Sequence, residues 1–463
     1  MEARGEGREE KGARLSRRAL ARRVAGKLML ALAVLVTTNL IGSFLLESEG
    51  TLGGVAWEAF RQASDVDTVV VGASYAQRGI DPDELDSCLG SSTINLGSPA
   101  QPLDDSYLAV KSVLSRRHVR RVIVGIGCES MFSTWGLRSE VPYLQGMLQG
   151  TTLSEAAEVY LGRMTDPQYV GTCNSLNLLF PWAYDFTPSP QRVVTNLEGK
   201  LDDTTTLSSA EEQTKHWSYH GKGYGTFEVQ FHPTRNDATS TSRYGNRPFL
   251  AARVDALLRI CDLCREHGVE CVVVATPHPT FDILAYGSYY PRSMGRLQRA
   301  VERHGAKFYD FNLYKGGRRL GKDDFSDFDH LRHAGARTFT SELAGILYRA
   351  ERGQDVSKSF YGYDDWDSYL DSVDYVAGVS AEATVRGDGS VTVAATVRTG
   401  RPRRAQLRFE AKVGGSWVVL RDWGSATSVT WTPPAHGAIE VRVRARIPGA
   451  DPTGTYVQKT FLR

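Results

Sequence analysis

The chain has 463 residues, which exceeds an ordinary single domain and indicates roughly two to four structural units. Its formal net charge is +2, but residues 1–27 carry nine basic and four acidic side chains, so the other 436 residues are slightly acidic. A nucleic-acid-binding domain carries its basic charge on a folded face, whereas here the charge lies in a terminal tail. We therefore expect no nucleic-acid partner.

An apolar segment follows the tail. Residues 28–46, LMLALAVLVTTNLIGSFLL, contain no charged side chain, and nineteen residues at about 1.5 Å each span a hydrocarbon core. A secretory signal peptide has a shorter apolar run and a small-residue cleavage site, which the following ESEGTLGGVAWE lacks. A cleaved signal stays the alternative. The basic flank favours a retained single-pass anchor in the cell membrane, with a cytoplasmic N-terminus and everything after Leu46 outside.

A parallel sheet is expected next. Four apolar runs rich in β-branched residues occupy 67–74, 120–127, 269–276 and 306–312. Continuous rather than alternating hydrophobicity is typical of strands covered on both faces. Helical stretches lie between them; two end at Gly268 and Gly305, and the second is expected to begin at a Ser293 cap. This alternation predicts a doubly wound α/β domain over residues 55–350.

An insertion and a second domain complete the predicted organisation. Residues 138–247 interrupt the α/β alternation and include a helix opened by a Thr152 and Glu155 capping box. Long insertions often lie over the ligand end of the sheet, so a lid or acceptor-binding subdomain and a decorative insertion both stay open. Acidic, aperiodic residues 351–374 predict a linker, and alternating residues 375–463 predict an antiparallel β-sandwich.

The six cysteines all follow the apolar segment, in a compartment where disulfides can form. Two of them, in the motif CDLC, fall at helical spacing on an apolar stripe, and no second CxxC motif completes a zinc site. We therefore expect Cys261 and Cys264 to be buried core thiols. Spacing does not reveal which cysteines pair.

Two motifs supply the elements of a serine nucleophile. The first strand runs into GASYAQRGIDP, which places Ser74 at the carboxyl end of a parallel sheet, where α/β folds carry ligand chemistry. A serine needs an imidazole within hydrogen-bond reach to react. The motif FSDFDHLRHAG, residues 325–335, offers His330 as the base and Asp327 to orient it, with Asp329 and His333 as supporting residues. A solvated loop, or a weak metal site at His330 and His333, are the alternatives.

A third motif, INLGSPAQ, lies between the first two long strands. We expect the backbone N–H groups of Gly97 and Ser74 to bind a developing oxyanion. In this order, VVVGASYAQRGIDP, INLGSPAQPLDDSY, CREHGVECVVVATPHP and FSDFDHLRHAGARTF together resemble the SGNH (GDSL-type) hydrolase superfamily. More narrowly, they resemble its membrane-anchored envelope subgroup, which includes DltD proteins of teichoic-acid D-alanylation and AlgJ/AlgX-type alginate acetylation proteins. That resemblance implies a flavodoxin-like SGNH fold over residues 55–350, the triad Ser74, His330 and Asp327, and no cofactor or metal.

Two departures from the family pattern concern the catalytic machinery. The family's Gly-Asp-Ser reads Gly72-Ala73-Ser74, and its Gly-x-Asn is missing from GIGCES, residues 125–130. Loss of one oxyanion donor costs about 10²–10³ in rate. Asn95 or Gln101 are the candidate replacements.

Two functions follow from these patterns. One is an extracytoplasmic serine-dependent acyl esterase or O-acyltransferase acting on a cell-envelope glycan or another acyl-carrying substrate. The resemblance implies that a membrane O-acyltransferase supplies the acyl group. The other is a non-catalytic, membrane-anchored scaffold that binds glycan or partner proteins through a degenerate hydrolase domain. The C-terminal sandwich, with SWVVLRDWG and VTWTPP, resembles Ig-like triple-tyrosine modules of cell-surface proteins, which implies binding or spacing rather than chemistry.

Overall fold

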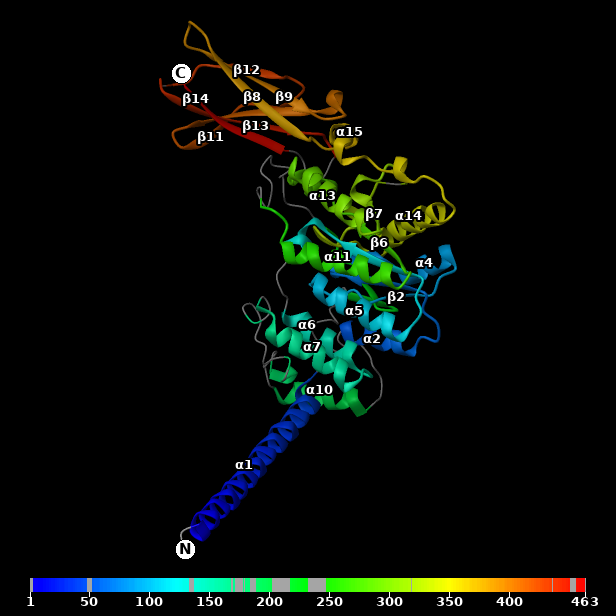
Figure 1. The fold of residues 1–463 in the computed structure, drawn as a ribbon. Coiled ribbons are helices and arrows are strands. Elements are labelled where there is room, and N and C mark those ends of the chain that lie inside the picture. Colours follow the sequence, from blue (N-terminus) through cyan, green and yellow to red (C-terminus); the bar gives the residue numbers. More distant parts are fainter. Residues whose placement is uncertain are drawn as a thin grey trace. The chain divides into compact units, whose positions relative to one another are not determined.

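Figure 1 shows the computed structural model of the chain. The structure describes residues 3–47, 52–132, 137–167, 170, 178, 180–183, 189–201, 217–231, 247–317, 319–434, 436–449 and 455–462. Two compact units result: residues 1–51 with 152–209, and residues 52–151 with 210–463. The predicted insertion is therefore divided between the two units, and its residues 202–216 and 232–246 lie outside the described residues.

The first unit is built around the long helix α1, Ala3–Leu46. Its segment Leu20–Leu46 has a mean hydropathy of 2.1 and none of it is buried, so it is long and apolar enough to be a membrane anchor or a signal sequence. Helices α7 (Leu153–Thr165) and α10 (Pro190–Leu201) and the 3₁₀ turn η2 (Pro181–Ala183) complete the unit. The capping box predicted for α7 is present, because Glu155 N–H donates to Thr152 Oγ1 and Thr152 N–H donates to Glu155 Oε2.

A five-stranded parallel sheet forms the centre of the second unit. Its order is β2-β1-β3-β6-β7, which is the flavodoxin-like order. β2 is added on one side of β1, and β3, β6 and β7 are added on the other side, so the order of strands reverses between β1 and β3. The strands are β2 (Thr93–Asn95), β1 (Thr68–Gly72), β3 (Arg121–Ile126), β6 (Glu270–Ala275) and β7 (Lys307–Asp310). Every residue of β1 and β3 is buried, which confirms the prediction of a sheet covered on both faces.

Helices cover the sheet in two groups. In one, α5 (Leu103–Arg116), α11 (Ala251–Glu266) and α13 (Tyr289–Arg303) pack in sequence, while α2 (Leu52–Gln62) packs on α6 (Leu137–Leu148). In the other, α14 (His333–Glu351) packs on α3 (Ser74–Gly79) and α4 (Pro82–Leu89). Short helix α12 spans Thr280–Ala285. The α/β class is thereby confirmed.

Two local predictions for this domain have different outcomes. Cys261 and Cys264 are buried on α11, as predicted, and Cys271 Sγ lies 4.0 Å from Cys261 Sγ. The predicted Ser293 cap is wrong, because α13 already begins at Tyr289 and Ser293 lies buried inside it. The helical pattern extends one turn further than the polar signal suggested.

The segment predicted as a linker, residues 351–374, has structure of its own. It contains 3₁₀ turns η5 (Ser357–Ser359) and η6 (Tyr363–Asp365) and helix α15 (Trp366–Ser372). Tyr363 Oη donates to Asp310 Oδ2 at 2.7 Å, and Tyr369 is buried. The stacking of Trp366 on Tyr290, with centroids 5.9 Å apart, and the hydrogen bond of Tyr363 attach this predicted linker to the α/β domain.

The C-terminal residues form two antiparallel sheets, as predicted (Figure 1). One has the order β11-β10-β13-β14 and the other β12-β9-β8. Their bounds are β8 Gly378–Val385, β9 Val391–Arg398, β10 Gln406–Val413, β11 Ser416–Gly424, β12 Ser428–Trp431, β13 Ala438–Arg446 and β14 Thr455–Leu462. Alternate residues of β13, including Val441, Val443 and Ala445, enter a shared core, which is the pattern that predicted a sandwich.

Candidate active site

The candidate nucleophile lies directly after the first strand. β1 ends at Gly72, and α3 begins at Ser74, so the serine stands where the sheet reverses its winding. Gly72 has a φ of +137°, and a Cβ there would lie 2.2 Å from the carbonyl oxygen of Gly125 on β3. A glycine is therefore required for the strand to turn this sharply beside its neighbour. Ser74 is half-buried at this position.

The structure brings the three predicted triad residues together. The Ser74 hydroxyl oxygen lies 2.7 Å from His330 Nε2, although the residues are 256 positions apart. On the other side of the ring, His330 Nδ1 lies 2.9 and 2.8 Å from the two carboxylate oxygens of Asp327. With Nδ1–H donating to Asp327, Nε2 is free to accept the serine proton, which is the tautomer that a general base needs.

A tight loop holds the aspartate and histidine in this arrangement. Phe325 and Leu331 form a β-bridge at its base, and Ser326 N–H donates to the His330 carbonyl at 2.9 Å. Within the loop, Asp327 Oδ1 accepts the backbone N–H groups of Asp329 at 2.8 Å and His330 at 2.9 Å. The Asp-x-x-His spacing is thus explained by an Asx-type turn that points both side chains toward Ser74.

Burial and charge set the protonation of the pair. Burial lowers the pKa of His330, opposed by the hydrogen bond that its Nδ1–H donates to Asp327, so the ring is neutral near pH 7. Burial alone would raise the pKa of Asp327, but its hydrogen bond with His330 and the charge of that ring lower it below its usual range, helped by Arg78. An ionised aspartate beside a neutral imidazole is the resting state of a general-base pair.

Arg78 is a charged neighbour of the triad that the sequence patterns did not single out. Burial lowers its pKa to about 10, so it stays protonated at neutral pH. Its guanidinium lies over the Phe227 ring, 4.6 Å from the centroid, in the hairpin of β4 (Trp217–Gly221) and β5 (Tyr224–Phe227). The described part of the insertion therefore contacts the helix that starts at the candidate nucleophile.

The expected oxyanion donors differ from one another in their hydrogen bonding. Gly97 N–H, expected to be open, instead donates to Asn95 Oδ1 at 2.9 Å. The Asn95 amide nitrogen donates to the carbonyls of Ala76 and Ile80, both at 2.9 Å. Asn95 is fully buried, so its side chain ties β2 to α3 in this conformation.

Gln101 and Ser74 complete the set of expected donors. Gln101 Nε2 lies 3.0 Å from Ser106 Oγ and 3.2 Å from Tyr143 Oη, and the Gln101 side chain is buried with them. Ser74 N–H is the first of α3 and has no acceptor within that helix. Of the donors expected from the sequence, Ser74 N–H is the one without an acceptor in its own helix, and the oxyanion roles of all four stay predictions.

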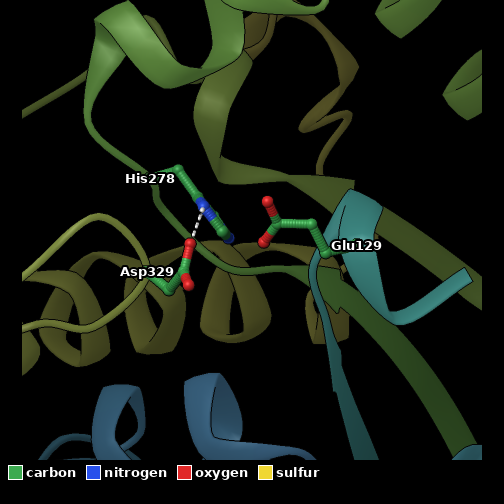
Figure 2. Close-up of side chains that lie close together, drawn as sticks. All are labelled: Glu129, His278 and Asp329. Carbon is green, nitrogen blue, oxygen red and sulfur yellow. Dashed lines mark ion pairs between the residues drawn. The ribbon is translucent and has the colours of Figure 1, made fainter. Parts of the chain in front are cut away.

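The two supporting residues lie in different places. His333 faces away from the triad: its Nδ1 lies 3.0 Å from Tyr224 Oη, and its ring stacks on His220 at a centroid distance of 4.1 Å. It therefore does not pair with His330 in a metal site. Asp329 instead joins Glu129 and His278, and one ligand atom of each lies within 4.8 Å of the others (Figure 2).

Sequence reasoning missed Glu129 and His278, although each lies in a motif that it noted. Glu129 is in GIGCES, whose missing asparagine was remarked, and His278 is in VVATPHP. Both follow buried strands, and the pairing of Ile126 with Ala275 places each residue three positions beyond the same level of the sheet. That strand-end position is the signal that could have identified them.

Comparison of the chain with protein-family models and with curated proteins finds no match. Membership of the SGNH superfamily therefore stays an expectation from the motifs. A fold alone does not determine chemistry, whereas the geometry of the site limits which reactions its residues can perform.

Proposed function

We propose that this chain is a membrane-tethered serine acyl esterase or O-acyltransferase that acts on a cell-envelope glycan. The observation that carries the proposal is the continuous contact from Ser74 through His330 to Asp327, with separations of 2.7 and 2.8 Å. Nucleophile, base and orienting carboxylate at such distances are the arrangement that activates a serine. The site lies at the switch point of a parallel sheet, where α/β enzymes bind substrates.

In the proposed reaction, His330 Nε2 takes the Ser74 proton as Oγ attacks an acyl carbonyl. The resulting tetrahedral oxyanion is bound by Ser74 N–H, and by Gly97 N–H once that group exchanges Asn95 for the oxyanion. Collapse expels the alcohol, which receives the proton from His330, and leaves an acyl ester on Ser74. Water or a sugar hydroxyl then gives its proton to His330 and attacks that ester, releasing an acid or an acylated sugar and restoring Ser74.

The apolar segment Leu20–Leu46 supports an envelope substrate, because a retained anchor would hold the enzyme at the membrane surface. In this proposal the basic tail is cytoplasmic and the remaining chain is extracytoplasmic. A membrane O-acyltransferase that hands over acyl groups is the proposed partner, on the strength of the family resemblance. The C-terminal sheets would serve as an Ig-like glycan- or partner-binding module.

Labelling with a fluorophosphonate tests the nucleophile. The full chain, purified in detergent, is expected to form a covalent adduct at Ser74, and Ser74→Ala should abolish it. Ser87, an exposed serine on α4, provides the control variant Ser87→Ala, which should label as wild type. Absence of labelling in intact wild-type protein, together with unchanged envelope acylation in cells carrying Ser74→Ala, contradicts the proposal.

A non-catalytic scaffold is the second candidate function. It is favoured by the oxyanion region, where Gly97 N–H and the Asn95 and Gln101 side chains are all engaged with other groups of the protein. Under this alternative, glycan or partner binding would survive Ser74→Ala and His330→Ala. It would be lost when residues 375–463 are removed, and the phosphonate would not react.

A further inference from the structure

A second cluster of ionisable side chains lies at the same edge of the sheet as the triad. It comprises Glu129 after β3, His278 after β6 and Asp329 from the triad loop. Figure 2 shows the three side chains converging from three separate segments, with the ion pair of His278 Nδ1 and Asp329 Oδ1, 3.9 Å apart, as a dashed line. One potential ligand atom of each lies within 4.8 Å of the others, so small side-chain movements would bring all three within bonding distance of a single ion.

His278 distinguishes this cluster from an ordinary group of acidic side chains. Its residue exposure is 8%, and neither ring nitrogen lies within hydrogen-bond distance of a partner among the described residues, although Nδ1 faces the carboxylates of Asp282 at 3.6 Å and Asp329 at 3.9 Å. Its backbone is fixed, because its N–H donates to Asn312 Oδ1 at 2.8 Å. Buried polar groups in folded proteins are nearly always satisfied, and one that is not calls for an ion or water at its position.

The groups around the ring carry an excess of negative charge. Asp282 Oδ2 lies 3.6 Å from His278 Nδ1, beyond hydrogen-bond length, and adds a third carboxylate to those of Glu129 and Asp329. Burial lowers the pKa of His278, but Asp282, Glu129 and Asp329 raise it to about 9, so a protonated ring offsets one of these charges and a metal ion would have to displace that proton. Bringing carboxylates together in a partly buried place is unfavourable unless a cation offsets them.

We propose that Glu129, His278 and Asp329 bind one divalent transition-metal cation, for which Zn²⁺ is the reference ion. One imidazole and two carboxylates form a mixed nitrogen and oxygen set that such ions favour over Mg²⁺ or Ca²⁺. Three protein ligands leave a coordination position for water or a substrate oxygen.

The surroundings include the outer contacts that orient metal ligands. Tyr286 Oη donates to Glu129 Oε1 at 3.0 Å, and Asp282 lies beside the imidazole of His278. A Cβ on Gly127 would lie 3.1 Å from His278 Nε2, so the glycine leaves room on that side of the ring. These neighbours fix the positions of the proposed ligand side chains, and they would do so with or without a bound metal.

The site is physically joined to the triad. Asp329 lies between Asp327 and His330 in the same turn, and the Tyr75 ring contacts the rings of both histidines, with centroids 5.7 Å from His278 and 6.1 Å from His330. A bound cation would therefore restrain the triad loop through Asp329. The metal-binding inference itself does not depend on the proposed acyl chemistry.

Metal binding by the full chain provides the test. Protein in detergent, carrying an affinity tag without histidines, is stripped with a chelator and titrated with Zn²⁺, Mn²⁺ and Mg²⁺ by calorimetry, and bound metal is counted by mass spectrometry. Variants His278→Gln and Glu129→Gln remove one ligand each. His304 has its own carboxylate partner, Asp262 at 2.9 Å outside the cluster, so His304→Gln is the matched control.

We expect wild type and His304→Gln to bind one equivalent of Zn²⁺ more tightly than Mg²⁺, and both ligand variants to bind it at least about tenfold more weakly. X-ray absorption should show one imidazole in the zinc coordination sphere. Absence of a stoichiometric site, or unchanged affinity in both folded ligand variants, overturns the inference. If His278→Gln does not fold, the partly exposed Glu129→Gln decides alone. Zinc binding in a protein that no phosphonate labels would contradict the acyl-transfer proposal and leave this one standing.

Discussion

Replacing Asn95 with alanine separates two roles for this residue: a structural tie between β2 and α3, and a side-chain donor to the oxyanion. The structure gives it three buried hydrogen bonds of 2.9 Å, to Gly97 N–H and to the carbonyls of Ala76 and Ile80. The Ala76 carbonyl keeps its bond from Ile80 N–H at 3.1 Å, so alanine chiefly leaves the Gly97 N–H and the Ile80 carbonyl without their partner.

The size of the expected effect follows from those two groups. A buried polar group left without its partner costs about 1–3 kcal/mol, so Asn95→Ala should lower the free energy of unfolding by about 4 kcal/mol. In a domain of this size that corresponds to a fall in Tm of roughly 10 °C. Because Gly97 N–H is then released toward Ser74, the labelling rate per folded molecule should fall by less than about tenfold.

Thermal unfolding by circular dichroism and the rate of fluorophosphonate labelling, both on the full chain, measure the two effects separately. Gln101→Ala is the companion variant, since the partners of Gln101 Nε2 within the described parts of the chain are the hydroxyls of Ser106 and Tyr143. It should cost less stability than Asn95→Ala and leave the labelling rate nearly unchanged. A labelling rate about 10²–10³ lower with an unaltered Tm in either variant would identify an oxyanion donor and refute the structural assignment.

Three further outcomes are expected. Asp327→Asn should slow labelling of Ser74 by about 10⁴-fold while the Tm changes little, because an amide no longer holds His330 in the accepting tautomer. If the variant and the wild type are labelled at the same rate, Asp327 is not part of the triad. Gly125→Ala should lower the free energy of unfolding by about 1–3 kcal/mol and slow labelling, because its Cβ would lie 2.6 Å from the Cβ of Ala76 on α3. Gly345→Ala is the control, and it should not destabilise the fold because the space around Gly345 is open. Burial and the neighbouring His333 lower the pKa of His220 below 6.5, so the unfolded chain binds its proton first and stability should fall as the pH drops below about 6.5. His220→Gln should therefore flatten the pH dependence of Tm below about pH 6.5, and curves that coincide would contradict this.

The predictions that held depend on periodicity and on strand ends. Continuous apolar runs predicted buried parallel strands, and alternation predicted the antiparallel sheets, because burial of one face or two imposes those patterns on the sequence. The contact of Ser74 with His330 was likewise predictable, since the carboxyl ends of parallel strands share one edge. Asp-x-x-His then needed only a tight turn to aim at the serine, which Asp327 provides by accepting two backbone N–H groups.

The predictions that did not hold concern side chains that compete for local partners. Gly97 was expected to present a free N–H, yet Asn95, two residues earlier, accepts that N–H in a turn typical of asparagine. Residues 351–374, predicted as a linker, also have a local partner that their composition does not reveal, because Tyr363 Oη donates to Asp310 Oδ2. In both cases the decisive interaction is a specific hydrogen bond, which hydropathy does not encode.

Glu129 and His278 show why the residues of a site can each stand in a recognisable motif and still not be predicted as a pair. The two residues are 149 positions apart, and neither motif indicates that the other lies beside it in the fold. Once β3 is known to pair with β6 through Ile126 and Ala275, both residues lie three positions beyond that pair and must face the same edge. The sequence does not show the order of the strands in the sheet, because that order depends on how the whole sheet packs and not on any one strand. Asp327 accepts the backbone N–H of Asp329, so the same turn that orients His330 also brings Asp329, the third member of the second cluster, to this edge of the sheet.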